Sequence, residues 1–152
     1  MPLLAHRDLG GAGKPPLVIL HGLLGSSRNW QTAGRDLSDQ FHVCALDLRN
    51  HGDSFHAHEV TYEIMAADVL AWLDAQGIER THLLGHSLGG KVAMLLACRH
   101  AGRVERLVVV DIAPKAYPHS HAREFDAMRE LDLVALQSRA EAEQQLAVRV
   151  PD

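Results

Sequence analysis

The stretch that decides the fold is His82-Leu83-Leu84-Gly85-His86-Ser87-Leu88-Gly89-Gly90, in which a short apolar run leads into the pattern G-x-S-x-G and an apolar, helix-like segment follows. The pattern predicts a sharp turn between a strand and a helix, because the flanking glycines let the two elements approach closely. Such a turn holds the Ser87 hydroxyl at a helix N-terminus, where unpaired backbone N–H groups favour negative charge. We therefore interpret Ser87 as a candidate nucleophile.

On both sides of this turn, short apolar runs alternate with helix-like stretches. The runs are typical of strands covered on both faces, and they occupy residues 17–20, 41–46, 82–84 and 107–112. The helix-like stretches span 28–37, 62–76 and 90–100, with capping candidates at Ser26, Ser27 and Thr61 and stopping glycines at Gly77 and Gly102. This alternation predicts an α/β fold with a mostly parallel sheet and flanking helices.

The character of the sequence changes after Asp111. Residues 113–118 are loop-like, and 122–149 have a helical pattern with Phe125, Met128 and Leu131 three residues apart. The capping-box form of Ser138-Arg139-Ala140-Glu141 predicts that a second short helix starts there. We expect two parts, a sheet-forming part over 1–114 and a helical part over 115–152.

Composition limits the classes of partner and the location. The 152 residues suit one domain, and 15 Lys and Arg against 19 Asp and Glu give a formal charge of -4, with no basic excess for nucleic acid. The N-terminus has no basic leader and only a three-residue apolar run, so we expect no signal peptide, no membrane span and a cytoplasmic protein. Cys44 and Cys98 lie in apolar runs and are predicted to be inert buried thiols, without a disulfide.

The loop His21-Gly22-Leu23-Leu24-Gly25 directly follows a predicted strand. A tetrahedral oxyanion beside Ser87 needs two hydrogen-bond donors, and the backbone N–H groups of Leu23 and Leu88 are the candidates. The alternative is that the glycines of this loop only turn the chain after the strand.

Two carboxylates end predicted strands at the same edge of the sheet. Asp111 follows Val108-Val109-Val110, where it could orient an imidazole, and the alternative is that it caps the next loop. Asp47 ends the 41–46 strand. His86, next to the serine, is interpreted as a positioned neighbour of the site.

Two pairs with the pattern His-x-His, His56-Ala57-His58 and His119-Ser120-His121, have ligand types that suit zinc or nickel. Both pairs lie in polar loops without a nearby cysteine or carboxylate cluster of ligand spacing. We therefore predict solvated loop histidines, no metal site and no organic cofactor.

Four motifs in order resemble the α/β-hydrolases, and more narrowly the bacterial YbfF-type esterases, which act on carboxylic esters and acyl thioesters. The motifs are 85–91, 21–30, 47–54 and Asp111-Ile112-Ala113-Pro114, and the resemblance runs from about Leu3 to the end of the chain. The resemblance implies that Ser87 is the nucleophile, that Leu23 and Leu88 are the oxyanion donors and that Asp111 is the acid of the triad. It also implies that Asp47 pairs with Arg49 to organise a loop. The segment from Lys115 onward would be the beginning of a helical lid.

The sequence departs from this family in one respect. Family members add two more strands and helices after the lid, and their last loop carries the catalytic histidine. After Ser87, only His100, His119 and His121 are available, and none is well placed as the base. We expect the base beyond residue 152, in a longer hydrolase of which this chain is a fragment. The strand at 107–112 would then lack an outer neighbour, and its open edge would favour self-association.

These observations predict a serine esterase or thioesterase that forms an acyl-enzyme on Ser87 from a small-molecule acyl ester or thioester. A serine at the turn argues against epoxide hydrolases and dehalogenases, which use an aspartate there, whereas acyl transferases and perhydrolases stay open. The alternative class is a catalytically inactive module with the same fold that serves in binding or assembly.

Overall fold

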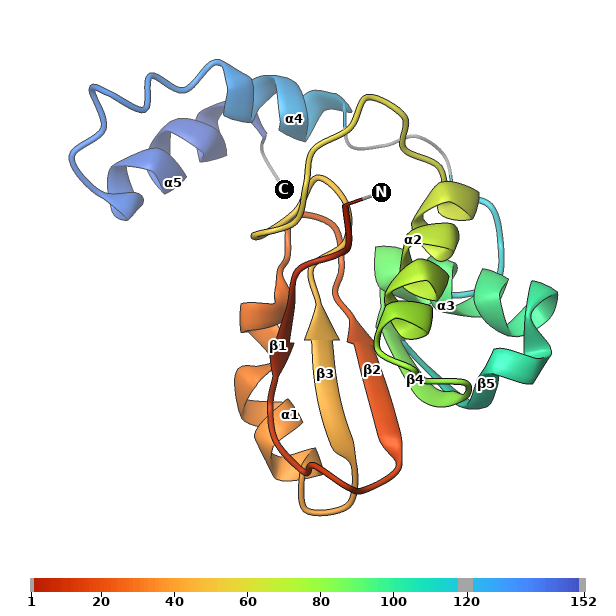
Figure 1. Cartoon of the computed structure of the whole chain (residues 1–152). Helices are drawn as coiled ribbons and strands as arrows, with labels where there is room; N and C mark the ends of the chain where they lie inside the picture. The colour runs from red at the N-terminus through yellow and green to blue at the C-terminus, as the bar shows by residue number, and fades with distance from the viewer. Residues whose placement is uncertain (1, 118–121, 151–152) are drawn as a thin grey trace. The chain divides into compact units, whose positions relative to one another are not determined.

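A computed structural model describes residues 2–117 and 122–150 of the chain. In this part, five strands form one sheet in the order β1-β3-β2-β4-β5 (Figure 1). They are β1 (His6–Asp8), β2 (Pro16–Leu20), β3 (His42–Leu46), β4 (Thr81–His86) and β5 (Val104–Val110). Strands β2 to β5 are parallel, and β1 pairs with β3 in the antiparallel direction. The predicted α/β class and mostly parallel sheet are confirmed. The sequence analysis did not identify β1, because two of its three residues are charged and the third is a histidine.

Helices cover both faces of the sheet. The 3₁₀ turn η1 (Ser27–Trp30) runs into α1 (Gln31–Leu37) on one face, and α2 (Tyr62–Ala75) and α3 (Leu88–Arg99) lie on the other (Figure 1). Thr61 caps α2, since its Oγ1 accepts a hydrogen bond from the Ile64 amide at 3.1 Å. Ser26 caps η1 with its own side chain. The predicted helix over 28–37 is therefore split, and its first turn is 3₁₀, as is common at helix N-termini.

The alternating side chains of the central strands build a core on each face. Val18 and Leu20 pack with the buried faces of α2 and α3, whereas Leu17 and Ile19 pack on the side of α1. Trp72 of α2 is 1% exposed and is the largest fully buried side chain. Burial on both faces fixes the positions of β2 and β3, and β4 pairs with strands on both of its sides, so the loops at their carboxyl ends start from a rigid edge.

Strand β5 has a neighbour on one side only, β4, within the described residues. Val108, in the middle of β5, is 50% exposed. The prediction that this strand lacks an outer neighbour is confirmed for this part of the chain.

The chain divides into two compact units, Met1–Pro114 and Lys115–Asp152. The second unit contains α4 (Ala122–Arg129) and α5 (Arg139–Arg149), and Ser138 caps α5 by accepting from the Glu141 amide at 3.2 Å. The second helix that was predicted to start at Ser138 is confirmed, but the helical pattern over 122–149 is interrupted between α4 and α5. Asp132 interrupts it, because its carboxylate accepts from the amides of Val134 and Ala135 and so stabilises a turn.

The two cysteines differ in their surroundings. Cys44 is buried in the core, but Cys98 is exposed in the last turn of α3, so its prediction as a core thiol was wrong. A run of apolar residues on a helix cannot face one side only, and Cys98 falls on the outer side. Both thiols are free. No helix in the described ranges combines the length and apolar character needed to cross a bilayer.

Candidate active site

Ser87 lies in the turn between β4 and α3, outside both regular elements. Its backbone has φ 49° and ψ -113°, which is uncommon for a residue with a side chain. The Ser87 amide donates to the Val110 carbonyl at 3.0 Å and so extends the pairing of β4 with β5. A Cβ atom at Gly85 would meet the backbone of Gly89 and Gly90, so this close approach requires glycine.

The loop that follows β2 packs directly against this turn. The Gly89 amide donates to the His21 carbonyl at 3.1 Å. A Cβ atom added to Gly22 would lie 2.7 Å from His86 Nδ1 and 3.3 Å from the Ser87 Cβ. The absence of a side chain at Gly22 therefore lets the loop reach the serine.

The two amides predicted to bind an oxyanion are unpaired. Within residues 2–117 and 122–150, neither the Leu23 N–H nor the Leu88 N–H donates to a protein acceptor. Leu88 is the first residue of α3, where helix N–H groups have no partner inside the helix. Leu23 lies next to Leu24, whose φ of 59° is also left-handed. Both amides are thus available to a ligand.

His21 fixes the loop that contains Leu23. Its Nε2 accepts from the Leu48 amide at 3.0 Å, so the ring proton is assigned to Nδ1, which donates to the Gly22 carbonyl at 2.7 Å. The ring is 1% exposed, and burial lowers the pKa of His21. A neutral imidazole of one tautomer therefore sets the Gly22 peptide. The sequence analysis missed this role, although a histidine directly after a buried strand was visible.

Asp47 organises the neighbouring loop through backbone amides. It accepts from the amides of Ser27 at 2.6 Å and Asp53 at 2.9 Å. Burial tends to raise the pKa of Asp47, but these hydrogen bonds and the nearby His21 outweigh it and leave the pKa lowered. Asp47 is thus held as a carboxylate beneath the loop.

The expected pairing of Asp47 with Arg49 was wrong. Arg49 instead forms a two-point ion pair with Asp68 of α2, at 2.5 and 2.7 Å. Its guanidinium also lies over the Phe55 ring, 5.5 Å from the centroid. The Asp47 carboxylate already accepts from two backbone amides, whereas Asp68 on α2 offers Arg49 a planar carboxylate for two parallel hydrogen bonds.

Asp111 directly follows β5 with φ 55°. Its carboxylate lies 3.9 Å from His86 Nε2, and its side chain is 87% exposed. The structure therefore brings the residues named as nucleophile and acid to the same edge of the sheet, with His86 beside them. The open face of the Asp111 carboxylate leaves room for a second imidazole.

A cavity of about 500 Å³ opens beside the turn. Gly22, Leu23, Leu24, Trp30 and His86 are among its lining residues. Its volume falls within the range of small-molecule sites, and its walls combine apolar side chains with the loop that carries the Leu23 amide.

The other candidate bases and ligands lie elsewhere. His100 follows the last residue of α3, roughly 18 Å from Ser87 along twelve helical residues. His119 and His121 lie outside the described residues. His56 and His58 are exposed, and no group of three ligand side chains in the described ranges includes them.

Comparisons with known proteins agree on one family. The model of a family described as the alpha/beta hydrolase fold matches residues 15–150. Esterase YbfF of Escherichia coli (strain K12) is 38% identical over 132 residues, which cover 87% of this chain and 51% of that protein. The sn-1-specific diacylglycerol lipase ABHD11 of Mus musculus is 42% identical over 130 residues, which cover 84% of this chain and 42% of that protein.

A solved structure entitled "Marine microorganism esterase" superposes with a TM-score of 0.90 and 37% sequence identity, covering 100% of this chain and 60% of that chain. The chain thus spans about half, or less, of the length of the curated relatives it matches.

Proposed function

Because this chain belongs to the α/β-hydrolase family, we propose that it is part of a serine hydrolase that cleaves carboxylic esters or acyl thioesters through an acyl-enzyme on Ser87. One observation carries the proposal. Ser87 has a left-handed backbone at a strand-to-helix turn, and the amides of the following Leu88 and of Leu23, in the loop packed against this turn, have no acceptor in the described part of the chain. Backbone strain of this kind concentrates at functional sites.

The reaction follows from this geometry. The Ser87 oxygen attacks the acyl carbonyl carbon and gives its proton to an imidazole, while the carbonyl oxygen becomes an oxyanion that accepts from the Leu23 and Leu88 amides. The intermediate collapses, and the alcohol or thiol leaves with that proton. Water then attacks the acyl-enzyme by the same route, releasing the acid. Each oxyanion donor contributes roughly 10²–10³ in kcat in comparable sites.

The base and the acid are assigned to different parts of the protein. We assign Asp111 the role of orienting the imidazole, because it lies at the same edge of the sheet as Ser87 and its carboxylate is exposed. The base is a histidine outside these 152 residues, since His100 is remote and the relatives are about twice as long. The helical unit from Lys115 onward is the beginning of a lid, and the protein acts in the cytoplasm.

The nucleophile is tested with a fluorophosphonate probe on the complete gene product. Ser87→Ala is expected to abolish labelling, because the probe reacts with an activated serine only. Ser38→Ala is the matched control, since Ser38 lies at the end of α1 and its hydroxyl donates to the Arg35 carbonyl of that helix. Labelling that survives in Ser87→Ala, or that is lost in Ser38→Ala, contradicts the assignment.

The position of the base is tested by comparing the 152-residue chain with the complete gene product. Removing the base from a serine and histidine unit costs about 10⁶ in turnover, so the short chain should label slower by several orders of magnitude. Equal labelling rates would place the base within these residues.

An inactive binding or assembly module is the second candidate function. Its support is that the imidazole adjacent to Ser87 in the described residues, His86, is the last residue of β4 and precedes the serine, whereas His100 lies at the far end of α3. Hydrolysis of p-nitrophenyl butyrate by the complete gene product decides between the two. Turnover that depends on Ser87 excludes the inactive module, and its absence favours that module.

A further inference from the structure

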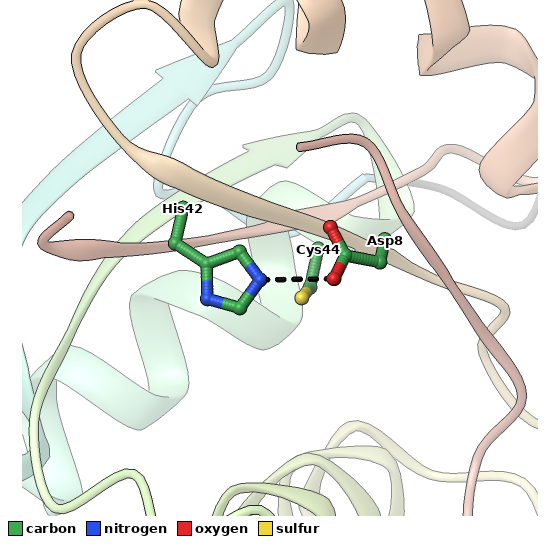
Figure 2. Close-up of side chains that lie close together, drawn as sticks. All are labelled: Asp8, His42 and Cys44. Carbon is green, nitrogen blue, oxygen red and sulfur yellow. Dashed lines mark hydrogen bonds and ion pairs between the residues drawn. The ribbon is translucent and has the colours of Figure 1, made fainter. Parts of the chain in front are cut away.

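Three side chains of metal-ligand type meet where β1 pairs with β3. Asp8 of β1 lies directly opposite Cys44 of β3 in the antiparallel register. His42 precedes Cys44 by two residues, so all three side chains share one face of the sheet (Figure 2). One ligand atom from each lies within 4.8 Å of the others. The cluster sits at the start of β3, at the end opposite Asp47, and is separate from the candidate active site.

The carboxylate of the cluster is already oriented. Asp8 Oδ1 accepts from the Gly10 amide at 2.9 Å, while Asp8 Oδ2 lies 3.0 Å from His42 Nε2. Backbone bonds of this kind hold a ligand in place, as outer-shell partners do at metal sites. Asp8 and His42 have side chains that are 55% and 30% exposed, whereas Cys44 is buried beneath them. A cation could therefore enter from solvent and meet the thiol from one side.

Thiolate, imidazole and carboxylate form the ligand set of zinc and its neighbours. Calcium and magnesium take oxygen ligands, so a thiol and an imidazole disfavour them. Bond lengths of about 2.0–2.3 Å place the ligand atoms of a tetrahedral zinc ion roughly 3.2–3.7 Å apart. The three ligand atoms lie within 4.8 Å of one another, so they must close by roughly 1 Å, through rotation of the exposed Asp8 and half-buried His42 side chains.

We propose that Asp8 Oδ2, His42 Nε2 and Cys44 Sγ bind one divalent cation of the zinc class, with water in the fourth position. The ion would connect the short edge strand β1 to β3 and so act as a structural clamp. Burial raises the pKa of the Cys44 thiol to about 11, and the cation must displace that proton. Binding is therefore weaker than at a site with a preformed thiolate.

The sequence analysis predicted no metal site because its only candidates were the two His-x-His pairs. The two parts of this cluster are 34 residues apart, and only the pairing of β1 with β3 brings them together. Since β1 itself was not predicted, neither was the cluster.

The test uses Co²⁺ as a spectroscopic substitute for Zn²⁺ in the complete gene product under reducing conditions. Bound Co²⁺ should give a near-ultraviolet charge-transfer band from thiolate to cobalt and the intense visible bands of a tetrahedral ion, at one ion per chain. Cys44→Ser should remove the charge-transfer band. Asp8→Asn and His42→Gln should each weaken the Co²⁺ Kd by about 10- to 100-fold or more.

Two matched controls separate this site from incidental binding. Cys98→Ser removes the exposed thiol of α3, and His56→Gln with His58→Gln removes the exposed pair. Both controls should keep the band and the affinity. A wild-type protein without the charge-transfer band overturns the proposal, as does a Co²⁺ Kd that is unchanged in Asp8→Asn and His42→Gln. Should Cys44→Ser fail to fold, the Asp8→Asn and His42→Gln variants, whose side chains reach solvent, still decide the question, with circular dichroism as the check on folding.

Discussion

At the scale of single residues, backbone strain gathers beside the cavity. Within the described part of the chain, four non-glycine residues have left-handed φ angles, and Leu24, Ser87 and Asp111 are three of them. Each such conformation costs about 1–3 kcal/mol and persists only where its surroundings enforce it. Three separate connections, after β2, β4 and β5, carry this cost at one edge of the sheet. The strain supports a role for this edge in function, because packing alone does not require it.

Gly22 tests how closely the loop must approach the serine. We expect Gly22→Ala to slow fluorophosphonate labelling of the complete gene product by about 10²-fold, because a displacement of about 1 Å at a reacting group has an effect of that size. Its added methyl would lie 2.7 Å from His86 Nδ1. Gly102→Ala is the control, since a Cβ there meets nothing within 4 Å. A Gly22→Ala variant that labels at the wild-type rate would show that the loop is not part of the site.

His21 predicts a pH dependence of stability. Its folded pKa lies below the ordinary 6.5 because the ring is buried. Below about pH 6.5, the unfolded chain therefore takes up a proton at His21 that the folded chain does not bind. The free energy of unfolding should be unaffected by His21 above that pH and should fall below it, by up to about 1.4 kcal/mol per pH unit.

Urea unfolding between about pH 5 and pH 8 measures this effect. His21→Gln should flatten the acid limb, and it should also lower stability at neutral pH by about 1–3 kcal/mol, because the Leu48 amide loses its acceptor. His58→Gln, which changes an exposed loop histidine, is the control for the loss of an imidazole. If the free energy of unfolding fell equally steeply at acid pH in His21→Gln and in the wild type, burial would not shift the pKa of His21.

At the scale of elements, the sequence predicts those whose signals are local. The cap at Thr61, the stop after α2 and the cap at Ser138 are each made by residues that are close together in the sequence. Strand β1 gives no local signal, because His6, Arg7 and Asp8 become a strand only through pairing with β3. The partner of Arg49 was equally hidden, since Asp68 lies on another element and only the packed core brings them together.

The ion pair between Arg49 and Asp68 connects the loop after β3 to α2. The two side chains are 8% and 10% exposed. Asp68→Ala should lower the free energy of unfolding by about 3–5 kcal/mol, because it leaves a buried guanidinium unpaired. Replacing both residues by Arg49→Met and Asp68→Leu should recover much of that loss, since no charge then remains buried.

The exposed pair of Arg139 with Glu143 on α5 provides the control. Glu143→Ala should change stability by less than about 0.5 kcal/mol, because solvent screens the interaction. Urea unfolding of the variants gives all three values. An Asp68→Ala loss as small as that of Glu143→Ala would contradict a buried pair.

At the scale of the whole molecule, the candidate site could be located from sequence only where motif and topology coincide. The turn at Ser87 and the loop at Leu23 follow neighbouring strands, so a parallel sheet places them together. The orientation of the Leu23 peptide could not be foreseen, because it depends on the tautomer of His21 and on the Leu48 amide. The catalytic histidine that Asp111 would orient could not be placed either, since the resemblance puts this histidine outside these residues.

The open edge of β5 is tested with Val108, half-exposed in the middle of that strand. In the isolated 152-residue chain, Val108→Lys should reduce aggregation on warming, because a charged residue on an edge strand opposes pairing with another chain. Its stability should change by less than about 0.5 kcal/mol, as for most surface substitutions. Val134→Lys is the control, since Val134 is 94% exposed in the helical unit and the change in charge is the same. Light scattering compares the two variants.

The complete gene product gives the opposite expectation for the same substitution. If further strands cover β5 there, as the length of the relatives suggests, Val108 is buried and a lysine ammonium at this position loses its water without gaining a partner. Val108→Lys should then lower the free energy of unfolding of the complete gene product by several kcal/mol, while Val134→Lys has a much smaller effect. A substitution that is neutral in both contexts would show that β5 is a true edge of the whole protein, and would favour an open sheet over one that is completed by residues outside this chain.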